Sequence, residues 1–441
     1  MLTSLIIDRN EAYTYWVSDV AGQSASLIIK GPYLVRTASI NGSSLSIQAD
    51  FNVSTTIEVI GAPSEIKRFI INNVERDFSY GIAGSLVASV TVSQPELDLP
   101  DLSSLDWYYL DSLPEIAENY DDGPWLNANL TSTNNSNSLS TTTSLYGSDY
   151  GFHAGILLLR GHFIADEASG TLTINTQGGS AHASSIYLNG SLVGSWTGDV
   201  ATSSRDQSYA LSGLKKGASY VLTVLIDNMG YDENYVIGLD TGKAPRGILR
   251  YDLSFGLFQS TSITWKISGN LGGEDYVDHV RGPLNEGGLY LERQGLHQPS
   301  PPISSFNFSS LTPYLGTSRS GVGFYTVQLN LSLPSDEWDI PLAFEFGNDT
   351  SIGTFRAQLW VNGWNFGRYV SNIGPQTRFP VPEGILNYQG ENWIGLAVWA
   401  LENGGARLPE FQLNAGVPVL TGREAVEVVN SPAWAARKAA Y

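Results

Sequence analysis

An eleven-residue phrase occurs twice in this sequence and constrains the fold more than any other feature. It reads IYLNGSLVGSW at residues 186–196 and LWVNGWNFGRY at residues 359–369, 173 positions further along. Each copy sets Asn-Gly between two short β-forming runs and ends on an aromatic residue after a further glycine. Asn-Gly is typical of two-residue hairpin turns, because both residues tolerate the positive φ that such a turn needs. The phrase therefore predicts the same β-hairpin in two places.

Two further segments extend this repeat. The offset of 173 also aligns VLTVLIDN (221–228) with IGLAVWAL (394–401), and an offset of 172 aligns FHAGILLLRGHF (152–163) with FYTVQLNLSLPS (324–335). Three matched segments in the same order and at nearly the same spacing indicate an internal duplication. We therefore predict two copies of one β-sandwich.

Alternation of apolar and polar residues dominates the rest of the sequence, for example in SLSIQADF (44–51) and GTLTINTQ (170–177). Short alternating runs bounded by Gly, Asn, Asp or Pro are typical of β-strands. Helical periodicity is nearly absent, and the best helix candidates are 423–428 and the Ala-rich tail after Pro432. The sequence therefore predicts an all-β chain of several sandwiches.

Stretches rich in proline and glycine mark the expected boundaries between these units. QPELDLPDLSSLDW (94–107) ends a smaller β-unit, and GPLNEGGLYLERQGLHQPSPP (282–302) separates the two sandwiches. The predicted units are a small β-domain at 1–101, a first sandwich at 102–281, a linker at 282–302, and a second sandwich with a C-terminal tail at 303–441.

The charge and residue types exclude several classes of function. A net charge of −19 argues against a nucleic-acid partner, because phosphates would be repelled. No apolar run approaches the roughly 18 residues that a membrane span needs, so we expect no membrane partner. The chain has no cysteine, which excludes disulfides and thiolate catalysis, and its five histidines lack the spacing of metal ligands. We therefore expect no metal and no other cofactor.

Abundant Ser, Thr, Asn and Gly favour an extracellular protein. The apolar stretch near residue 1 is interrupted by Asp8 and Arg9, so we expect any export signal to lie outside this chain. Eight Asn-x-Ser/Thr motifs are candidate glycosylation sites. They begin at Asn41, Asn52, Asn129, Asn134, Asn189, Asn307, Asn330 and Asn348.

The best candidate for ligand contact is the segment DNMGYDENYVIGLDTGKAPRGIL (227–249). It follows the last matched strand of the first sandwich, where the second copy has only the short ALENGGARLPE. A loop that is extended in one of two repeats is a stronger functional candidate than a shared feature. Its candidate substrate-binding residues are Asp232, Glu233, Asn234 and Tyr235, which could bond sugar hydroxyls and stack on a pyranose ring. The alternative is a structural loop tied down through Asp240 and Arg246.

Asn285-Glu286 imitates the Asn-Glu pair of retaining glycosidases, in which a glutamate is the general acid. The pair stands between a proline, Pro283, and two glycines, however, and not at the end of a rigid strand. We therefore favour a domain linker whose carboxylates pair with Arg281 and Arg293. Among the tryptophans of the second sandwich, we expect Trp364 in the hairpin turn to be the most exposed.

Longer motifs match a known family across nearly the whole chain. They include LIIDRNEAYTYW (5–16), SLYGSDYGFHAGILLLRGHF (144–163), VLIDNMGYDENYVIG (224–238), RGPLNEGGLYLERQGLHQP (281–299) and SNIGPQTRFPVPEGILNYQGENW (371–393). In these motifs the chain resembles the large fungal β-galactosidases of glycoside hydrolase family 35. In that family a catalytic (β/α)₈ barrel precedes small β-domains and two jelly-roll sandwiches.

The resemblance implies a small β-domain followed by two jelly-roll, galactose-binding-like sandwiches. It implies that this chain is the non-catalytic C-terminal part of a secreted enzyme that hydrolyses terminal β-D-galactosyl residues. The two catalytic glutamates of the family lie on the barrel and match no position here, so no catalytic residue carries over. The implied partners are the barrel and galactosides or galactose-containing polysaccharides. Tyr235 matches a loop aromatic that borders the outer sugar subsites, where relatives often have Trp.

Two alternatives to a scaffold stay open. The chain could be a stand-alone carbohydrate-binding module, in which Tyr235 or Trp364 contacts sugar. It could also be a separate piece that stays docked on its barrel, for which exposed apolar patches would be evidence.

Overall fold

The computed structural model describes residues 6–21, 25–230, 237, 244–256, 260–270, 287–347, 349 and 353–435. Within these ranges nearly all regular structure is β-strand, and α1 (Tyr290–Arg293) is the one α-helix, which confirms the predicted all-β class. Short 3₁₀ turns are η1 (Ala12–Thr14), η2 (Ile82–Gly84), η3 (Leu102–Ser104), η4 (Pro114–Ile116), η5 (Gly147–Tyr150) and η8 (Ile303–Ser305).

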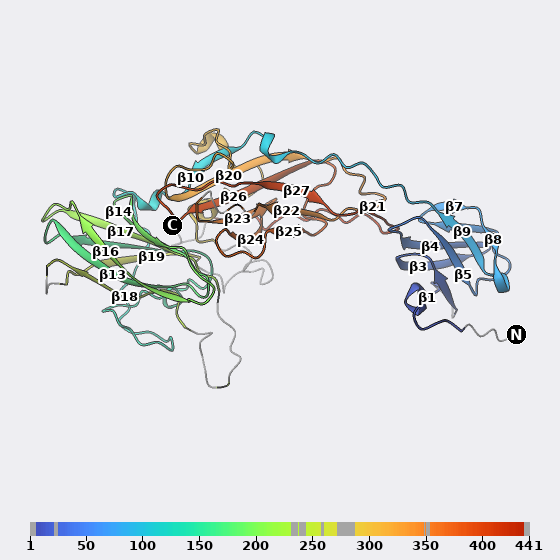
Figure 1. Ribbon diagram of the computed structural model, residues 1–441, viewed down its shortest axis with the longest axis horizontal. Coiled ribbons are helices and arrows are strands. Elements are labelled where there is room, and N and C mark those ends of the chain that lie inside the picture. The colour runs from blue at the N-terminus through green and yellow to red at the C-terminus, as the bar shows by residue number, and fades with distance from the viewer. Residues whose placement is uncertain are drawn as a thin grey trace.

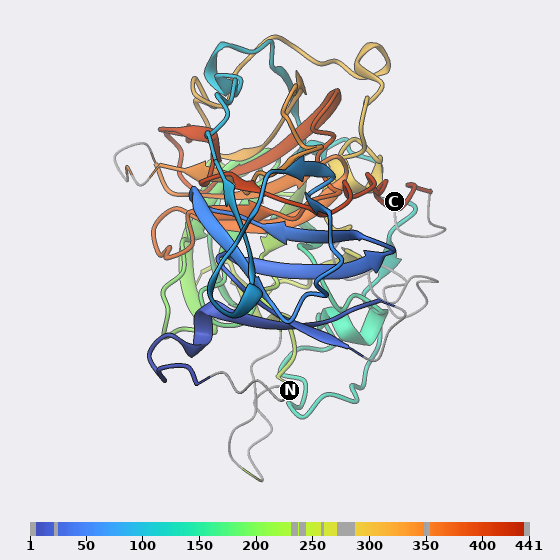
Figure 2. The same ribbon diagram turned by 90° about the vertical axis from the view of Figure 1, so that its right-hand side faces the viewer.

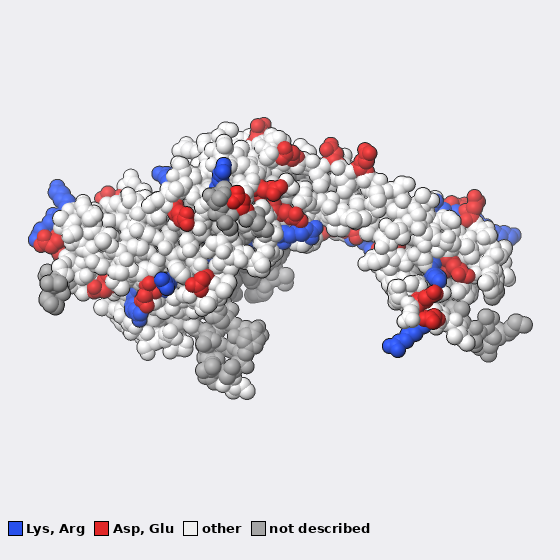
Figure 3. Space-filling model, viewed as in Figure 1, with Lys and Arg blue, Asp and Glu red and all other residues white. Residues whose placement is uncertain are grey.

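Three β-units form an arched molecule (Figure 1). The N-terminal unit lies at one end of the long axis, the first sandwich lies at the other end, and the second sandwich lies between them. Viewed along that axis, the N-terminal unit stands in front of both sandwiches (Figure 2). The space-filling view shows an open hollow between the two ends of the arch (Figure 3).

The N-terminal unit packs two sheets around one apolar core. Its strands are β1 (Tyr15–Asp19), β2 (Ser26–Lys30), β3 (Leu34–Asn41), β4 (Ser44–Asp50), β5 (Thr55–Ile60), β6 (Arg68–Ile71), β7 (Val74–Arg76), β8 (Ser79–Tyr80) and β9 (Leu86–Val90). They form sheets of order β1-β2-β5-β9-β8 and β3-β4-β6-β7. The alternation predicted in 44–51 places Leu45, Ile47 and Ala49 fully in this core.

The first sandwich pairs a six-stranded sheet with a three-stranded sheet. Its strands are β11 (Leu126–Asn127), β12 (Leu157–Ile164), β13 (Ser169–Gln177), β14 (Ser184–Leu188), β15 (Ser191–Trp196), β16 (Ser204–Ser212), β17 (Ser219–Ile226), β18 (Gly247–Ser254) and β19 (Thr264–Ser268). The sheets have the orders β11-β19-β12-β17-β14-β15 and β16-β13-β18.

The second sandwich repeats this topology in seven of its strands. Its strands are β10 (Tyr108–Asp111), β20 (Gly321–Asn330), β22 (Leu342–Phe346), β23 (Phe355–Val361), β24 (Trp364–Val370), β25 (Arg378–Val381), β26 (Glu391–Ala400) and β27 (Phe411–Ala415). The run β20-β26-β23-β24 matches β12-β17-β14-β15, and β25-β22-β27 matches β16-β13-β18. This correspondence confirms the predicted duplication.

Both Asn-Gly pairs form the predicted hairpin turns. Asn189 and Gly190 connect β14 to β15 with φ values of 42° and 86°, and Asn362 and Gly363 connect β23 to β24 with φ values of 48° and 81°. Two successive positive φ values are the mark of the type I′ turn, whose twist matches that of the strands. Each asparagine side chain also accepts a hydrogen bond at 2.8 Å from a backbone amide of the neighbouring strand in the sheet, Val221 of β17 or Trp393 of β26.

Strand pairing corrects the predicted alignment of β17 with β26. In the first sandwich Ile186 pairs with Val224. In the second, Leu359 pairs with Leu396. The hairpins thus differ by 173 positions, whereas β17 and β26 differ by 172. A slip of one residue exchanges the two faces of a strand, so the predicted register would have exchanged core and interface residues.

The predicted match of 152–163 with 324–335 also has the wrong register. Leu158 pairs with Leu225, and Phe324 pairs with Ala397, which sets β12 and β20 166 positions apart instead of 172. A shift of six residues preserves the alternation of faces, so the sequence pattern fitted both registers. The difference arises because the connection from β20 to β23 contains additional residues, among them β21 (Trp338–Asp339).

The edge strand β10 belongs to the second sandwich, although it precedes the whole first sandwich in the chain. It pairs with β20, so that Tyr109 lies opposite Tyr325. In the first sandwich the corresponding place beside β12 is taken by β19. Residues 108–111 were expected in the first sandwich, within 102–281. Their pairing shows that the two sandwiches interlock through the chain.

The large sheets of the two sandwiches pack against each other. The shared apolar cluster contains Leu158, Tyr187 and Leu225 from the first sandwich, and Phe324, Trp360 and Trp399 from the second. Leu289, Leu291 and Leu296, around α1, complete this cluster. Residues 287–298 of the predicted linker 282–302 are therefore largely buried between the sandwiches, whereas Pro299, Ser300 and Pro302 are exposed. Asn285 and Glu286 of that linker lie outside the described residues.

The C-terminal segment crosses the second sandwich and joins it to the N-terminal unit. Its strand β28 (Val419–Leu420) pairs with β21, and Leu420 exchanges backbone hydrogen bonds with Phe51 at 2.8 and 3.0 Å. The helix predicted at 423–428 is wrong, because residues 421–435 contain no helix. The indole of Trp364 donates to the Val429 carbonyl at 3.2 Å, and the side chain is buried. The expectation that Trp364 is exposed is therefore also wrong.

Candidate functional site

The predicted ligand-binding residues Asp232, Glu233, Asn234 and Tyr235 lie outside the described residues. The two ends of their loop are described and lie side by side. Arg246 joins them, because its guanidinium donates to the Gly230 carbonyl at 2.6 and 3.0 Å and to the Ala244 carbonyl at 3.0 Å. Arg246 itself is almost fully buried. The loop therefore leaves the first sandwich from a fixed base.

A buried charge cluster lies beneath this base, where the two sandwiches meet. Asp227 of the first sandwich pairs with Arg368 and lies 3.9 Å from Arg356, both of the second sandwich. Arg356 also donates to the carbonyls of Ala181 and Thr197 at 2.8 and 2.7 Å. These bonds fix the loop base relative to the second sandwich as well as to the first.

His182 is buried beside this cluster and is held neutral. Burial lowers its pKa to about 4, Asp227 opposes the shift, and Arg356 and Arg246 add to it. Its ring nitrogens lie 3.2 Å from the Gly179 carbonyl and 3.5 Å from the Thr176 hydroxyl. This geometry gives His182 a packing role at near-neutral pH.

A second cluster of buried charges contains two carboxylates. Glu115 pairs with Arg293, and both side chains are almost fully buried. Asp122 contacts Arg160 and His162 at 2.7 Å and Lys266 at 3.4 Å. Burial favours a higher pKa for Asp122, but the hydrogen bonds from Arg160 and His162 outweigh it and lower that pKa. A carboxylate that pairs with arginine stays ionised, so it has no proton to donate and is poorly suited to general acid catalysis.

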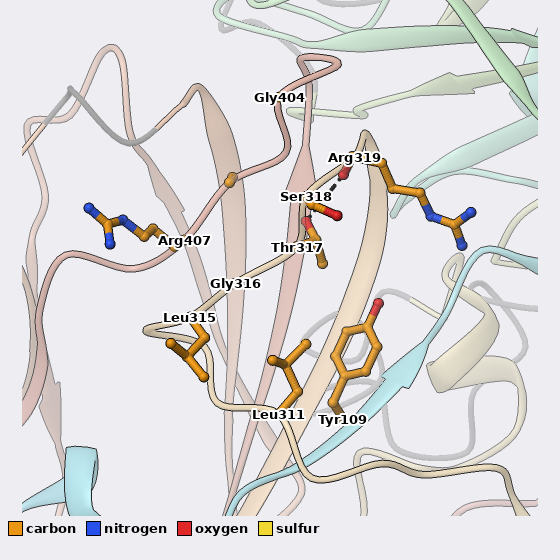
Figure 4. Close-up of a pocket in the computed structure, with 10 residues that line it drawn as sticks. Tyr109, Leu311, Leu315, Gly316, Thr317, Ser318, Arg319, Gly404 and Arg407 are labelled. Carbon is orange, nitrogen blue, oxygen red and sulfur yellow. Dashed lines mark hydrogen bonds between the residues drawn. The ribbon is translucent and has the colours of Figure 1, made fainter.

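An open cleft of about 530 Å³ lies at one end of the second sandwich (Figure 4). Its apolar wall consists of Tyr109, Leu311 and Leu315. Figure 4 shows that the Tyr109 hydroxyl points toward the segment that carries Ser318 and Arg319. Sequence reasoning missed this cleft because β10, which carries Tyr109, is far from the other walls in the chain.

A second cleft, of about 770 Å³, lies where the N-terminal unit meets the second sandwich. Asn72, Asn73 and Arg76 line one side, and Asp336 and Glu337 line the other. Next to it, Thr421 donates to Asp50 at 2.7 Å and the Gly422 amide donates to the Ala49 carbonyl at 3.0 Å. This contact joins the N-terminal unit to the rest of the chain.

Most candidate glycosylation sites are accessible. Asn189 is half-buried, and its side-chain oxygen accepts the Val221 amide. Asn348 lies outside the described residues. The exposed sites are Asn41, Asn52, Asn129, Asn134, Asn307 and Asn330.

The charges on the visible surface agree with the composition. Figure 3 shows acidic and basic side chains scattered over one face of all three units, with no basic tract on that face. Among the described residues, no helix is both long and apolar enough to cross a membrane.

Comparisons with known proteins match every unit of the fold. A family model described as the β-galactosidase second all-beta domain matches residues 120–232 and again 290–404, one match in each sandwich. A model described as β-galactosidase domain 3 matches residues 14–99 in the N-terminal unit. One family description thus covers both copies of the duplication.

Curated relatives match over the full chain. A probable beta-galactosidase A of Emericella nidulans is 49% identical over 452 aligned residues, which cover 100% of this chain and 44% of the relative. Beta-galactosidase A of Aspergillus niger is also 49% identical, with the same coverage. The chain therefore spans less than half the length of these relatives.

Solved structures add little to this assignment. A family 2 glycosyl hydrolase from Bacteroides cellulosilyticus is 11% identical with a TM-score of 0.21, over 68% of this chain and 31% of that one, which is too distant to support an argument. The family models cover well over half of the chain, and they confirm the resemblance found in its motifs. The chain belongs to the β-galactosidase family, as its domain 3 followed by two copies of its second all-beta domain.

Proposed function

We propose that this chain is the scaffold of a β-galactosidase that hydrolyses terminal β-D-galactosyl residues. The observation that carries the proposal is the 49% identity over the whole chain to β-galactosidases of which it covers 44%. Both matched domain types are all-β. Hydrolysis with retention needs two carboxylates about 5 Å apart, one of them protonated. The buried carboxylates Glu115, Asp122 and Asp227 are instead paired with arginines, so we assign the chemistry to a separate catalytic domain.

We propose that this catalytic domain lies in the hollow of the arch. The N-terminal unit exposes several large apolar side chains, among them Tyr13, Val17 and Tyr33, which are 81%, 74% and 62% exposed. Val17 lies on β1, an edge strand on the lower side of the unit in Figure 1. Exposed apolar side chains gathered on one unit favour burial against a partner.

The loop at 231–243 is the proposed contact with sugar. Arg246 joins the two ends of the loop to each other, and the Asp227–Arg368 pair ties the strand end before the loop to the second sandwich. A rigid base lets a binding loop present a side chain with little loss of entropy. We assign Tyr235 to an outer subsite for galactosides, with Asp232, Glu233 and Asn234 as hydrogen-bonding neighbours, and we assign the enzyme to the extracellular space.

A chimera tests the proposed function. This chain would replace the matching 44% of Aspergillus niger β-galactosidase A, and hydrolysis of a nitrophenyl β-galactoside would be measured. We expect activity in the chimera and none in the isolated chain. We also expect Tyr235→Ala in the chimera to raise KM for a galactose disaccharide and to leave kcat unchanged.

Two results would overturn the proposal. One is turnover by the isolated chain that Glu286→Gln abolishes, since this would place the acid in this chain. The other is a folded chimera without activity. The alternative, a stand-alone carbohydrate-binding module, predicts that the isolated chain binds galactose in calorimetry and loses that binding in Tyr235→Ala.

A further inference from the structure

The isolated strand bridges place the open cleft of Figure 4 at the end of the second sandwich that corresponds to the loop-bearing end of the first. In the first sandwich, Tyr146 pairs with Gly247, at the end of the long connection 227–246 between β17 and β18. In the second, Thr317 pairs with Ala406, in the connection 401–410 between β26 and β27. The duplicated fold thus carries a long loop at this end of one copy and a short connection beside an open cleft in the other.

The walls of this cleft are preformed. Thr317 and Ala406 exchange backbone hydrogen bonds at 2.9 and 3.2 Å, which fasten the two lining segments together. Gly405 and Gly316 allow the close approach, because a Cβ at either position would lie about 2 Å from a backbone oxygen of the opposite segment, at 1.9 and 2.1 Å respectively. Tyr109 is held by β10, with its ring 5.0 Å from that of Tyr325. Little ordering would therefore be lost when a ligand enters.

The lining combines an apolar wall with hydrogen-bonding groups. Leu315 is 71% exposed and stands beside Leu311 and the ring of Tyr109. Burial raises the pKa of Tyr109 to about 12, with Asp111 adding to the shift and Arg319 opposing it, so its hydroxyl remains a donor at ordinary pH. Ser318 adds a second hydroxyl.

Two arginines supply further donors, and none of the described lining residues is acidic. Arg319 is paired with Asp111. Arg407 makes no ion pair with any residue in the described part of the chain. Figure 4 shows the two guanidinium groups at opposite ends of the cleft.

We propose that this cleft binds a pyranose sugar, at a site separate from the loop at 231–243. The apolar C–H face of the ring would lie on Leu311, Leu315 and Tyr109, and the ring hydroxyls would accept from or donate to Tyr109 and Ser318. The Arg407 guanidinium at one end, which has no ion-pair partner among the described residues, favours an acceptor oxygen of an adjoining sugar unit. The proposal depends on this lining alone and stands whether or not the chain serves a catalytic domain.

Gly404 offers a way to block the cleft without strain. It lines the cleft, its φ is not in the left-handed region, and a Cβ there would meet no atom within 4 Å. Gly404→Tyr should therefore fill the cleft and leave the fold intact. Titration of the 441-residue chain with galactose and with a galactose disaccharide, followed by calorimetry, should show saturable binding that falls about tenfold or more in this variant.

Matched variants separate sugar contact from general surface effects. Leu315→Ser should weaken binding severalfold, whereas Val417→Ser, at a site in the same sandwich with 70% exposure, should not change it. A comparison of galacturonate with galactose tests the role of the arginines. If galacturonate binds more tightly than galactose and Arg407→Gln abolishes that difference, the site is assigned to anionic sugars.

The outcome of two comparisons decides the proposal. Binding that is kept in Gly404→Tyr but lost in Tyr235→Ala would place the sugar at the loop and would overturn it. The absence of saturable binding of any of these sugars to the folded chain would also overturn it. Binding that is lost in Gly404→Tyr and kept in Tyr235→Ala would establish the cleft as a separate site.

Discussion

Truncation of Trp360 to alanine tests whether the apolar cluster between the large sheets holds the two sandwiches together. Trp360 is fully buried on β23, with its ring 6.4 Å from that of Phe324 and 6.0 Å from the His297 ring. It projects from the second sandwich into the cluster that Tyr187 enters from the first. The substitution would leave a cavity at the centre of this interface.

The expected loss of stability follows from burial. A tryptophan buries about 200 Å². At about 25 cal/mol per Å² of apolar surface this is about 5 kcal/mol. The indole nitrogen is buried and has no hydrogen-bond partner among the described residues, so its removal returns about 1 kcal/mol of desolvation cost. We therefore expect Trp360→Ala to lower the free energy of unfolding by about 4 kcal/mol, within the range of about 3–5 found for such truncations.

Urea unfolding followed by far-ultraviolet circular dichroism measures this loss without relying on tryptophan emission. Trp393→Ala is the matched control, because Trp393 is only half-buried and its indole donates to the surface residue Glu391 at 2.7 Å. Its loss should be clearly smaller. A loss below about 1 kcal/mol for Trp360→Ala, or equal losses for both variants, would refute the view that this cluster joins the sandwiches.

Three further predictions follow from described contacts. The pKa of His182 is about 4 in the folded chain and 6.5 for an unperturbed histidine, so the unfolded chain binds this proton at a higher pH than the folded one. The free energy of unfolding should therefore fall as the pH drops from 6.5 toward 4, by up to about 1.4 kcal/mol per pH unit. His182→Gln should flatten this slope in urea titrations between pH 7 and 4.5, and an unchanged slope would contradict the assignment. Gly190→Ala and Gly363→Ala both place alanine at positive φ, which costs about 1–2 kcal/mol each. A Cβ at Gly363 would also lie 2.3 Å from the Ser431 hydroxyl, whereas the nearest atom to a Cβ at Gly190 is 3.7 Å away. Gly363→Ala should therefore lower the melting temperature more, unless Ser431→Gly accompanies it. Gly422→Val would place a Cβ 2.2 Å from the Asn72 side-chain oxygen and should loosen the junction with the N-terminal unit. Cleavage after Glu96 by a Glu-specific protease should then be about tenfold faster, and an unchanged rate would show that this contact does not fix the N-terminal unit.

The parts of the fold that depend on local pattern could be predicted from the sequence. Asn189-Gly190 and Asn362-Gly363 specify their turns through their own backbone preferences, and alternating residues specify strands whichever partner they have. Strand register was harder, because an alternating strand looks the same after any even shift. The six-residue error in aligning β12 with β20 has this cause.

Non-local contacts could not be read from the sequence. The pairing of Tyr109 with Tyr325 joins segments more than two hundred residues apart, and nothing near residue 109 indicates its partner. Trp364 looked exposed because it follows a turn, yet the C-terminal segment covers it. The open cleft was missed for the same reason, since its walls come from three separate segments. The loop residues Asp232 to Tyr235 remain a prediction from composition and from the asymmetry between the two copies.

The placement of β10 has a consequence for how the protein is made. At a synthesis rate of about 5–20 residues per second, the strand leaves the ribosome roughly 10–40 seconds before its partner β20 does. Throughout that interval the first sandwich can fold, but the nascent chain carries a strand that has nothing to pair with. Conversely, a gene cut between the two sandwiches would leave β20 with a bare edge open to aggregation. The two sandwiches look like separate domains, yet the second takes its edge strand from the segment that precedes the first.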